Sequence, residues 1–280
     1  MNIGLIFDSI IVKPLATILI GSYQALIFLH IPYALGFSII ILTIVIRFIL
    51  YPLMSSQLKA SKKMQTLSPH ISKLKEKHKG DAKRIQAETM RLYKEHGVNP
   101  AAGCLPLIIQ MPVIWGLYTL LQKVVSINSH SVVSEVNKLT YISAFKLTNP
   151  WDPNFFGIPL GAVPSKLMSF DKFFTVGSLI LLVPILTGFF QFIQSKMMLT
   201  SAPKQAMVEK GGVKKKDDFA SVFQSQSLYI FPVMIGFFSF GFPIGLSLYW
   251  NTFTIFGIIQ QYLISGWGGL KDLNLFKSNK

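Results

Sequence analysis

Long apolar runs alternate with short basic stretches along most of the chain. Five runs are long enough to cross a bilayer as helices, because a core of about 30 Å takes roughly 20 residues at about 1.5 Å per residue. We expect these spans at residues 32–56, 100–122, 172–198, 219–243 and 244–266. Only the short turn Gly241–Gly245 separates the last two, which predicts an antiparallel pair of helices there. The pattern therefore predicts an all-α, polytopic membrane protein with a core of five transmembrane helices.

The first 31 residues are less uniformly apolar than these five runs. Asp8 and Lys13 interrupt them, and Pro14 suits the start of a helix. This pattern favours a helix that lies in the membrane interface, with residues 1–31 on the extracytoplasmic side. The alternative is that they form a first transmembrane helix. A cleaved signal is not expected, because Asp8 precedes the first positive charge and Pro14 interrupts the apolar run.

Residues 57–99 form a basic, polar stretch after the first span. They hold eleven Lys and Arg residues against four Asp and Glu residues. We expect Pro69 to begin one helix that ends at Gly80, and Asp81 to cap a second helix. Tyr93 is the only aromatic residue here, so the stretch lacks the stacking platforms of a nucleic-acid surface. We predict a cytoplasmic helical hairpin with a solvated surface and no direct nucleic-acid function.

The distribution of positive charge predicts the topology. The formal net charge is +15 although 51% of the residues are hydrophobic, and Lys and Arg in short loops favour the cytoplasmic side. The basic stretches 57–99 and 199–218 fall on one side if the five spans alternate. The weakly charged loop 123–171 falls on the other side, and the tail 267–280 on the basic side. We therefore expect the N-terminus outside and the C-terminus in the cytoplasm.

Arg47 is a single charge within the otherwise apolar run Ser38–Leu53. It lies roughly 22 Å along a helix from Pro32, which places it inside the bilayer core towards the cytoplasmic face. A charge at such a depth costs from about 2.5 to more than 10 kcal/mol, so an arginine there marks a functional site by default. The alternative is that its side chain reaches the headgroups from a helix end. Because the interiors of the five spans hold no Asp or Glu, Arg47 needs water or an anionic ligand.

Other polar residues in the spans are candidates to surround Arg47 in one hydrated cavity. The alternative for the amides is an ordinary hydrogen bond between helices, and for the aromatic residues a place at the membrane interface. The candidates are Gln110, Gln191, Gln194, Asn251 and Gln260, with Tyr249 and Trp250. We find no hydrolase or phosphate-loop motif and a single cysteine, Cys104, so catalytic residues, a metal site and a cofactor are not expected.

Four stretches closely resemble the YidC/Oxa family of membrane protein insertases. They are TIVIRFILYPL, KMQTLSPHISKLKEKHKGD, MRLYKEHGVNPAAGCLPLIIQMPVIWGLY and FPVMIGFFSFGFPIGLSLYWNTFTIFGIIQQ. The resemblance implies a five-helix core around a hydrophilic groove that opens to the cytoplasm and to lipid. It assigns the groove arginine to Arg47, a groove glutamine to Gln191 or Gln194, and a groove aromatic to Trp250.

The resemblance also implies the function and partners. We expect an insertase, not an enzyme, in the plasma membrane of a bacterium, which receives nascent membrane proteins and releases them sideways into the lipid bilayer. The Sec translocon and the ribosome or targeting machinery are expected partners, although the tail 267–280 is short for a ribosome-binding segment. The alternative from another class is a small-solute transporter or channel, which would show inverted repeats that we do not find in this sequence.

Overall fold

The computed structural model describes residues 3–78, 80–99, 105–124, 129–166, 178–198 and 219–272. Cys104, the basic loop 199–218 and the tail from residue 273 lie outside the described residues. The described helices confirm the all-α fold. They are α1 (Ile3–Phe7), the π-helical η1 (Asp8–Val12), α2 (Lys13–Phe28), α3 (Ala34–Ile49), α4 (Tyr51–Lys77), α5 (Ala82–Glu95), α6 (Leu105–Val124), α7 (Ser129–Asn137), α8 (Ser178–Met198), α9 (Phe219–Gly241) and α10 (Ile244–Ser265).

The chain divides into two compact units, and each is described by itself. The first unit comprises Met1–Ile49, Leu107–Phe190 and Val233–Phe256. The second unit comprises Leu50–Pro106, Gln191–Pro232 and Gly257–Lys280. The division falls between α3 and α4 and within α6, α8, α9 and α10.

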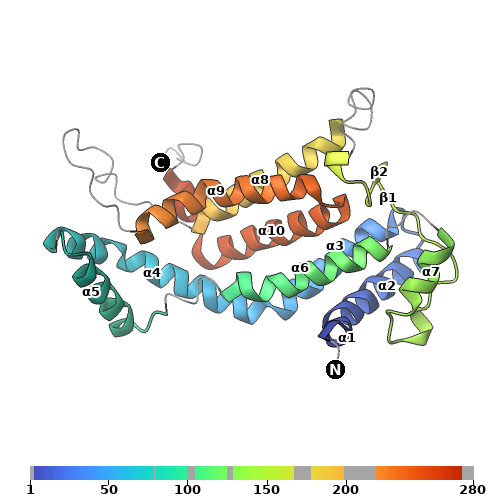
Figure 1. Ribbon diagram of the computed structural model, residues 1–280, viewed down its shortest axis with the longest axis horizontal. Helices are drawn as coiled ribbons and strands as arrows, with labels where there is room; N and C mark the ends of the chain where they lie inside the picture. Colours follow the sequence, from blue (N-terminus) through green and yellow to red (C-terminus); the bar gives the residue numbers. More distant parts are fainter. Residues whose placement is uncertain are drawn as a thin grey trace. The chain divides into compact units, whose positions relative to one another are not determined.

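In the first unit, α2 packs along α3, and their apolar faces form a large part of its core (Figure 1). Leu19 and Ile20 of α2 are fully buried, as are Leu35, Ile39 and Leu42 of α3. The three α3 residues recur at intervals of three and four, so they lie on one face of the helix. This face holds α3 in place, and Arg47 follows on the same helix.

Two of the described helical stretches are long and apolar enough to cross a membrane, namely Gly4–Phe28 and Ile180–Met198. The pair α3 and α4 adds a third if the two helices count as one broken span, and Leu228–Gly241 is a shorter apolar helix. The five-span arrangement stays a prediction. For the N-terminal region, the length of Gly4–Phe28 suits a transmembrane helix as well as an interfacial one, so both alternatives stay open.

The expected first span, 32–56, is interrupted. The helix α3 ends at Ile49, and α4 begins at Tyr51 with Pro52 in its first turn. Proline lacks the N–H that would continue the preceding helix, which explains the break and agrees with the expectation that Pro52 kinks or ends the span. The residues of α4 then continue into the hairpin without a second break.

The helical hairpin within 57–99 is confirmed, with one correction. The helices α4 and α5 lie side by side (Figure 1), and the Asp81 side chain accepts a hydrogen bond of 3.0 Å from the backbone N–H of Arg84. The expectation that Pro69 begins a helix is wrong, because α4 runs through it. Leu67 is buried just before this proline and Leu74 packs after it, so tertiary contacts on both sides outweigh the lost backbone hydrogen bond.

The described part of loop 123–171 is an ordered part of the first unit. It contains α7, the short turns η3 (Ser143–Phe145) and η4 (Pro164–Lys166), and a two-stranded ribbon, β1 (Asn154–Phe155) and β2 (Ile158–Pro159). The carbonyl oxygens of Leu160 and Ala162 accept hydrogen bonds of 2.8 and 3.0 Å from the N–H groups of Gly245 and Ile244. These bonds occupy the free donors at the start of α10 and attach the loop to that helix end.

The helices α9 and α10 form the expected antiparallel pair across the turn after Gly241 (Figure 1). The Ser239 and Ser247 hydroxyls are 2.8 Å apart, and Ser239 also donates to the Thr187 hydroxyl of α8 at 3.3 Å. All three residues are buried. Small polar side chains therefore connect the three helices within the first unit, as is common between membrane helices.

Candidate functional site

Arg47 is buried in the first unit, with only 3% of its surface exposed. Its Nη2 donates a hydrogen bond to the backbone oxygen of Phe253 on α10. The guanidinium carbon lies 3.4 Å from the centre of the Phe253 ring and 6.0 Å from that of Phe256. The side chain thus turns towards α10 and away from the protein surface, which argues against the alternative that it extends to the headgroups.

A second buried pair adjoins this contact. The Gln110 side chain of α6 donates to the Tyr249 hydroxyl at 2.5 Å, and both residues are buried. The Tyr249 ring stacks on Phe253 with centres 5.8 Å apart. Gln110, Tyr249, Phe253 and Arg47 therefore form a continuous cluster across α6, α10 and α3, in which Phe253 is half-buried and the other three are buried.

The cluster and nearby residues of α10 contain buried polar atoms without hydrogen-bond partners in the described part of the chain. Within the described residues, Arg47 Nε, Gln110 Oε1, Asn251 Oδ1 and Thr254 Oγ1 are buried and have no hydrogen-bond partner. Each such atom costs about 1–3 kcal/mol while it stays unpaired. The first unit thus carries donors and acceptors that an incoming polar segment or water can satisfy, and one of them belongs to a cation.

The structure brings together some of the predicted site residues. Arg47 and Gln110 join the cluster, and Trp250 is half-buried on α10, where it follows Tyr249 in the sequence. Gln191 is buried and Gln194 is half-buried on α8, but both belong to the second unit. A single groove lined by all five residues therefore stays a prediction.

Of the three aromatic residues at this site, the sequence offered only Tyr249 as a candidate. Tyr249 is fully buried, which favours the candidate position beside Arg47 over the alternative of an interfacial aromatic. Phe253 and Phe256 were not considered at all, although Tyr249, Phe253 and Phe256 follow one another at intervals of four and three. That spacing places them on one face of α10 and was the available signal. It could not show that Arg47 is their partner.

Gln260 makes an ordinary hydrogen bond between helices, which was the alternative to a place in the cavity around Arg47. It is buried in the second unit, and its side-chain nitrogen lies 3.2 Å from the Ser55 hydroxyl of α4. This is a hydrogen bond between two helices, as expected for an amide in an apolar helix.

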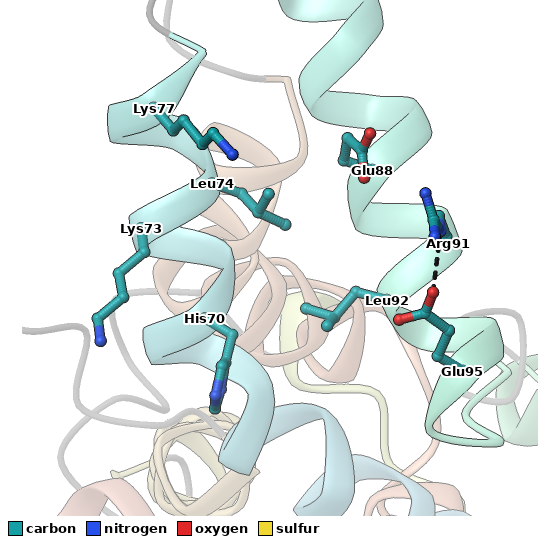
Figure 2. A pocket seen from close by; sticks show the side chains of 8 residues that line it. All are labelled: His70, Lys73, Leu74, Lys77, Glu88, Arg91, Leu92 and Glu95. Atoms are coloured by element: carbon teal, nitrogen blue, oxygen red, sulfur yellow. Dashed lines mark hydrogen bonds and ion pairs between the residues drawn. The ribbon is translucent and has the colours of Figure 1, made fainter.

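The hairpin carries a surface cleft of about 400 Å³ between α4 and α5. Figure 2 shows Leu74 and Leu92 pointing towards each other across it, with charged side chains around them. Arg91 pairs with Glu95 at 2.9 Å, but the two side chains are 70% and 53% exposed, so the pair adds little stability. The lining residues are His70, Lys73, Leu74, Lys77, Glu88, Arg91, Leu92 and Glu95.

No group of three or more His, Cys, Asp or Glu residues that could hold a metal ion occurs in the described ranges.

Comparison with known proteins gives consistent matches. The family model of the 60Kd inner membrane protein matches residues 27–268. The membrane protein insertase MisCA of Bacillus subtilis (strain 168) is 34% identical over 235 residues, which cover 82% of this chain and 70% of the relative. The membrane protein insertase YidC of Fusobacterium nucleatum is 31% identical over 229 residues, covering 82% and 85%.

Two further proteins also match. The inner membrane protein ALBINO3 of Arabidopsis thaliana chloroplasts is 33% identical over 258 residues, covering 86% of this chain and 49% of the relative. A crystal structure of an active YidC insertase aligns with a TM-score of 0.50 and 24% identity, over 81% of this chain and 41% of that one. This last match supports the fold.

Proposed function

Because the chain belongs to the YidC/Oxa family of membrane protein insertases, which are not enzymes, we propose that it accepts segments of client membrane proteins in a hydrophilic groove around Arg47 and releases them sideways into lipid. The proposal specifies a groove open to the cytoplasm. Arg47, Gln110 and Trp250, all of the first unit, would line it.

The observation that carries this proposal is the environment of Arg47. In the described part of the chain its recorded partners are a backbone carbonyl and two aromatic rings, and no carboxylate is among them. A buried cation without a counter-ion is costly, and a ligand that brings negative charge lowers that cost. An acidic extracellular tail of a client fits this requirement.

The unpaired polar atoms support passage of a polar segment. Gln110 Oε1 accepts hydrogen bonds from backbone N–H groups, and Thr254 Oγ1 accepts or donates. A client's backbone would satisfy them partway across the membrane, where it otherwise loses its hydrogen bonds to water. Hydration and the charge of Arg47 would act together.

Lateral release requires an apolar surface that faces lipid. In the first unit, Ile185 and Phe189 of α8 are exposed one helical turn apart, as are Val233 and Phe237 of α9. These outward side chains suit contact with lipid tails. A client's apolar segment would leave along such a surface, and its partition into lipid would drive release.

The topology is part of the proposal, within the bacterial membrane location that the family indicates. The hairpin and C-terminus would lie in the cytoplasm and residues 129–166 outside. On a Cys104→Ala background, we expect a cysteine at Lys73 to react with an impermeant thiol reagent only from the cytoplasm, and one at Ser143 only from outside. Both positions are exposed. Reversed labelling would contradict the five-span arrangement.

The hairpin is proposed to recruit clients and their targeting partners, including the ribosome and the Sec translocon. Its cleft combines a small apolar centre with lysines at its edge, so it suits a short amphipathic segment with acidic residues. The few apolar contacts that hold the hairpin together leave room for adjustment to different partners.

Reconstitution into liposomes tests the function. The purified protein should insert a single-span client with an acidic extracellular tail, measured by protection of that tail from added protease. Liposomes without the protein serve as the control. Solute flux without client insertion would instead support the transporter alternative.

A further inference from the structure

The Phe253 ring covers the charge of Arg47, and this contact extends the proposed function. We propose that Phe253 is a gate residue that holds Arg47 in a shielded position, and that a client's carboxylate displaces the ring to reach the guanidinium. The proposal names a specificity-determining residue and rests on the proposed insertase function. The positions of the charged residues along the sequence do not indicate a role for Phe253.

Contacts along one face of α10 position the Phe253 ring and its neighbours. Tyr249 stacks on Phe253, and Tyr249 is itself fixed by its hydrogen bond with Gln110. Phe256 contacts Phe48 of α3 edge to face, with ring centres 5.6 Å apart. The aromatic face of α10 is therefore ordered by contacts with α3 and α6, and Phe253 lies against Arg47 as part of that arrangement.

Phe253 binds Arg47 in two separate ways. Its backbone oxygen accepts a hydrogen bond from Nη2, and its ring face lies 3.4 Å from the guanidinium carbon. The ring attracts the cation because an aromatic face carries partial negative charge. A substitution of the side chain removes the second contact and leaves the first.

The contact is a weak substitute for an anion. A charge-assisted hydrogen bond between guanidinium and carboxylate is stronger and satisfies two N–H groups at once, including Arg47 Nε, which has no partner in the described residues. A carboxylate can therefore replace the ring, whereas a neutral segment gains too little to do so. The gate would make the groove selective for acidic clients.

Reactivity of Arg47 with phenylglyoxal tests the shield without any insertion assay. The chain's other arginines, Arg84 and Arg91, lie on the exposed hairpin and serve as internal references in a peptide map. We expect Arg47 to react much more slowly than both in the wild-type protein. Phe253→Leu should raise the relative rate of Arg47 by about two- to thirtyfold, the range that corresponds to a lost cation–π contact.

Two control variants separate this contact from general loosening. Phe256→Leu removes the more distant ring, 6.0 Å away, and should raise the rate by less than about twofold, because the attraction falls with distance. Phe237→Leu changes an exposed side chain on α9 and should leave the rate of Arg47 modification unchanged. If Phe253→Leu does not fold, Phe253→Met keeps a similar volume without a ring. An unchanged Arg47 rate in a folded Phe253 variant would overturn the proposal.

Protection by a peptide tests the displacement. A synthetic client tail rich in Asp and Glu should slow modification of Arg47, and half-protection should need several times less peptide in Phe253→Leu than in the wild type. The same peptide with Asn and Gln should not protect. If the acidic peptide protects both proteins equally, Phe253 is not a gate. If the Arg47 labelling gives the expected results but the liposome assay shows no client insertion, the proposed insertase function is contradicted. The shielding of Arg47 by Phe253 would still stand.

Discussion

Arg47 and Arg91 are the same residue type in opposite environments. Arg47 is buried in the first unit against aromatic rings and a backbone carbonyl. Arg91 is largely exposed on the hairpin and pairs with Glu95 at 2.9 Å. The exposed pair contributes about 0–1 kcal/mol, whereas a buried charge without an anion costs several kcal/mol. The difference teaches that burial without a counter-ion, and not charge itself, distinguishes Arg47 from an ordinary surface arginine.

The first unit and the hairpin also differ in how much of their side-chain surface is buried. The first unit has a continuous apolar core, which includes Leu35, Ile39 and Leu42 of α3. The helix α5 of the hairpin has no fully buried residue. A region with few buried contacts opens at low free energy, so the hairpin suits adaptable recruitment and the first unit suits a fixed site.

The largest expected effect follows from removing the hairpin. Deletion of Ile71–His96 should reduce client insertion to the level of empty liposomes, because recruitment is lost. The first unit should keep its thermal unfolding temperature, since the deleted residues belong to the second unit. The liposome assay measures insertion, and circular dichroism of the same preparation measures the thermal unfolding temperature. Normal insertion by the deleted variant would place recruitment elsewhere, for instance at Lys214–Lys216.

The next effect compares the two arginines directly. Arg47→Ala should slow insertion of acidic-tailed clients by about tenfold or more, because hydrogen bonds to charged groups contribute about 1.5–3 kcal/mol. Arg47→Lys should keep most activity, since a point charge still attracts an acidic tail. Arg91→Ala is the matched control and should change the rate little. Equal loss for acidic and neutral clients in Arg47→Ala would contradict pairing by charge.

Two glycines extend the comparison to packing. A Cβ at Gly36 would lie 1.9 Å from the Phe155 ring, so Gly36→Ala should lower the free energy of unfolding by about 1–3 kcal/mol. Gly80 of the hairpin has open space but a φ of +97°, so Gly80→Ala should cost about 1 kcal/mol through backbone strain.

Asparagine distinguishes the two causes. At Gly80 it should restore part of the loss, because Asn tolerates positive φ better than Ala. At Gly36 it should be worse than Ala because it is larger. Chemical unfolding in detergent measures all four variants. The same order of Ala and Asn at both positions would show that one cause acts at both.

The smallest expected effect concerns buried hydroxyls. Ser239→Ala removes the bonds to Ser247 and Thr187 and should cost about 0.6 kcal/mol, up to about 1.7, as for other hydrogen bonds between membrane helices. Ser72→Ala is the hairpin control, because Ser72 bonds only to the Ser68 carbonyl of its own helix among the recorded contacts. A larger loss for Ser72→Ala in chemical unfolding would reverse the comparison.

Much of the local structure could be predicted from the sequence. The apolar runs predicted helices, Pro52 predicted the break after α3, and Asp81 predicted the cap of α5. These features depend on contacts within one or two helical turns, so the neighbouring residues in the sequence are enough to predict them. Pro69 was misjudged because buried Leu67 and the contact of Leu74 with the neighbouring helix outweigh the local signal.

The sequence by itself determined that Arg47 is an isolated charge in an apolar helix and therefore a candidate site. Only the tertiary structure decided that Phe253 shields it and that Gln110 holds Tyr249 beside it. These partners lie 206 and 139 positions apart along the chain, and no helical period relates residues at such separations. Long-range packing alone brings them together, because the contact of a side chain with another helix depends on how the helices pack.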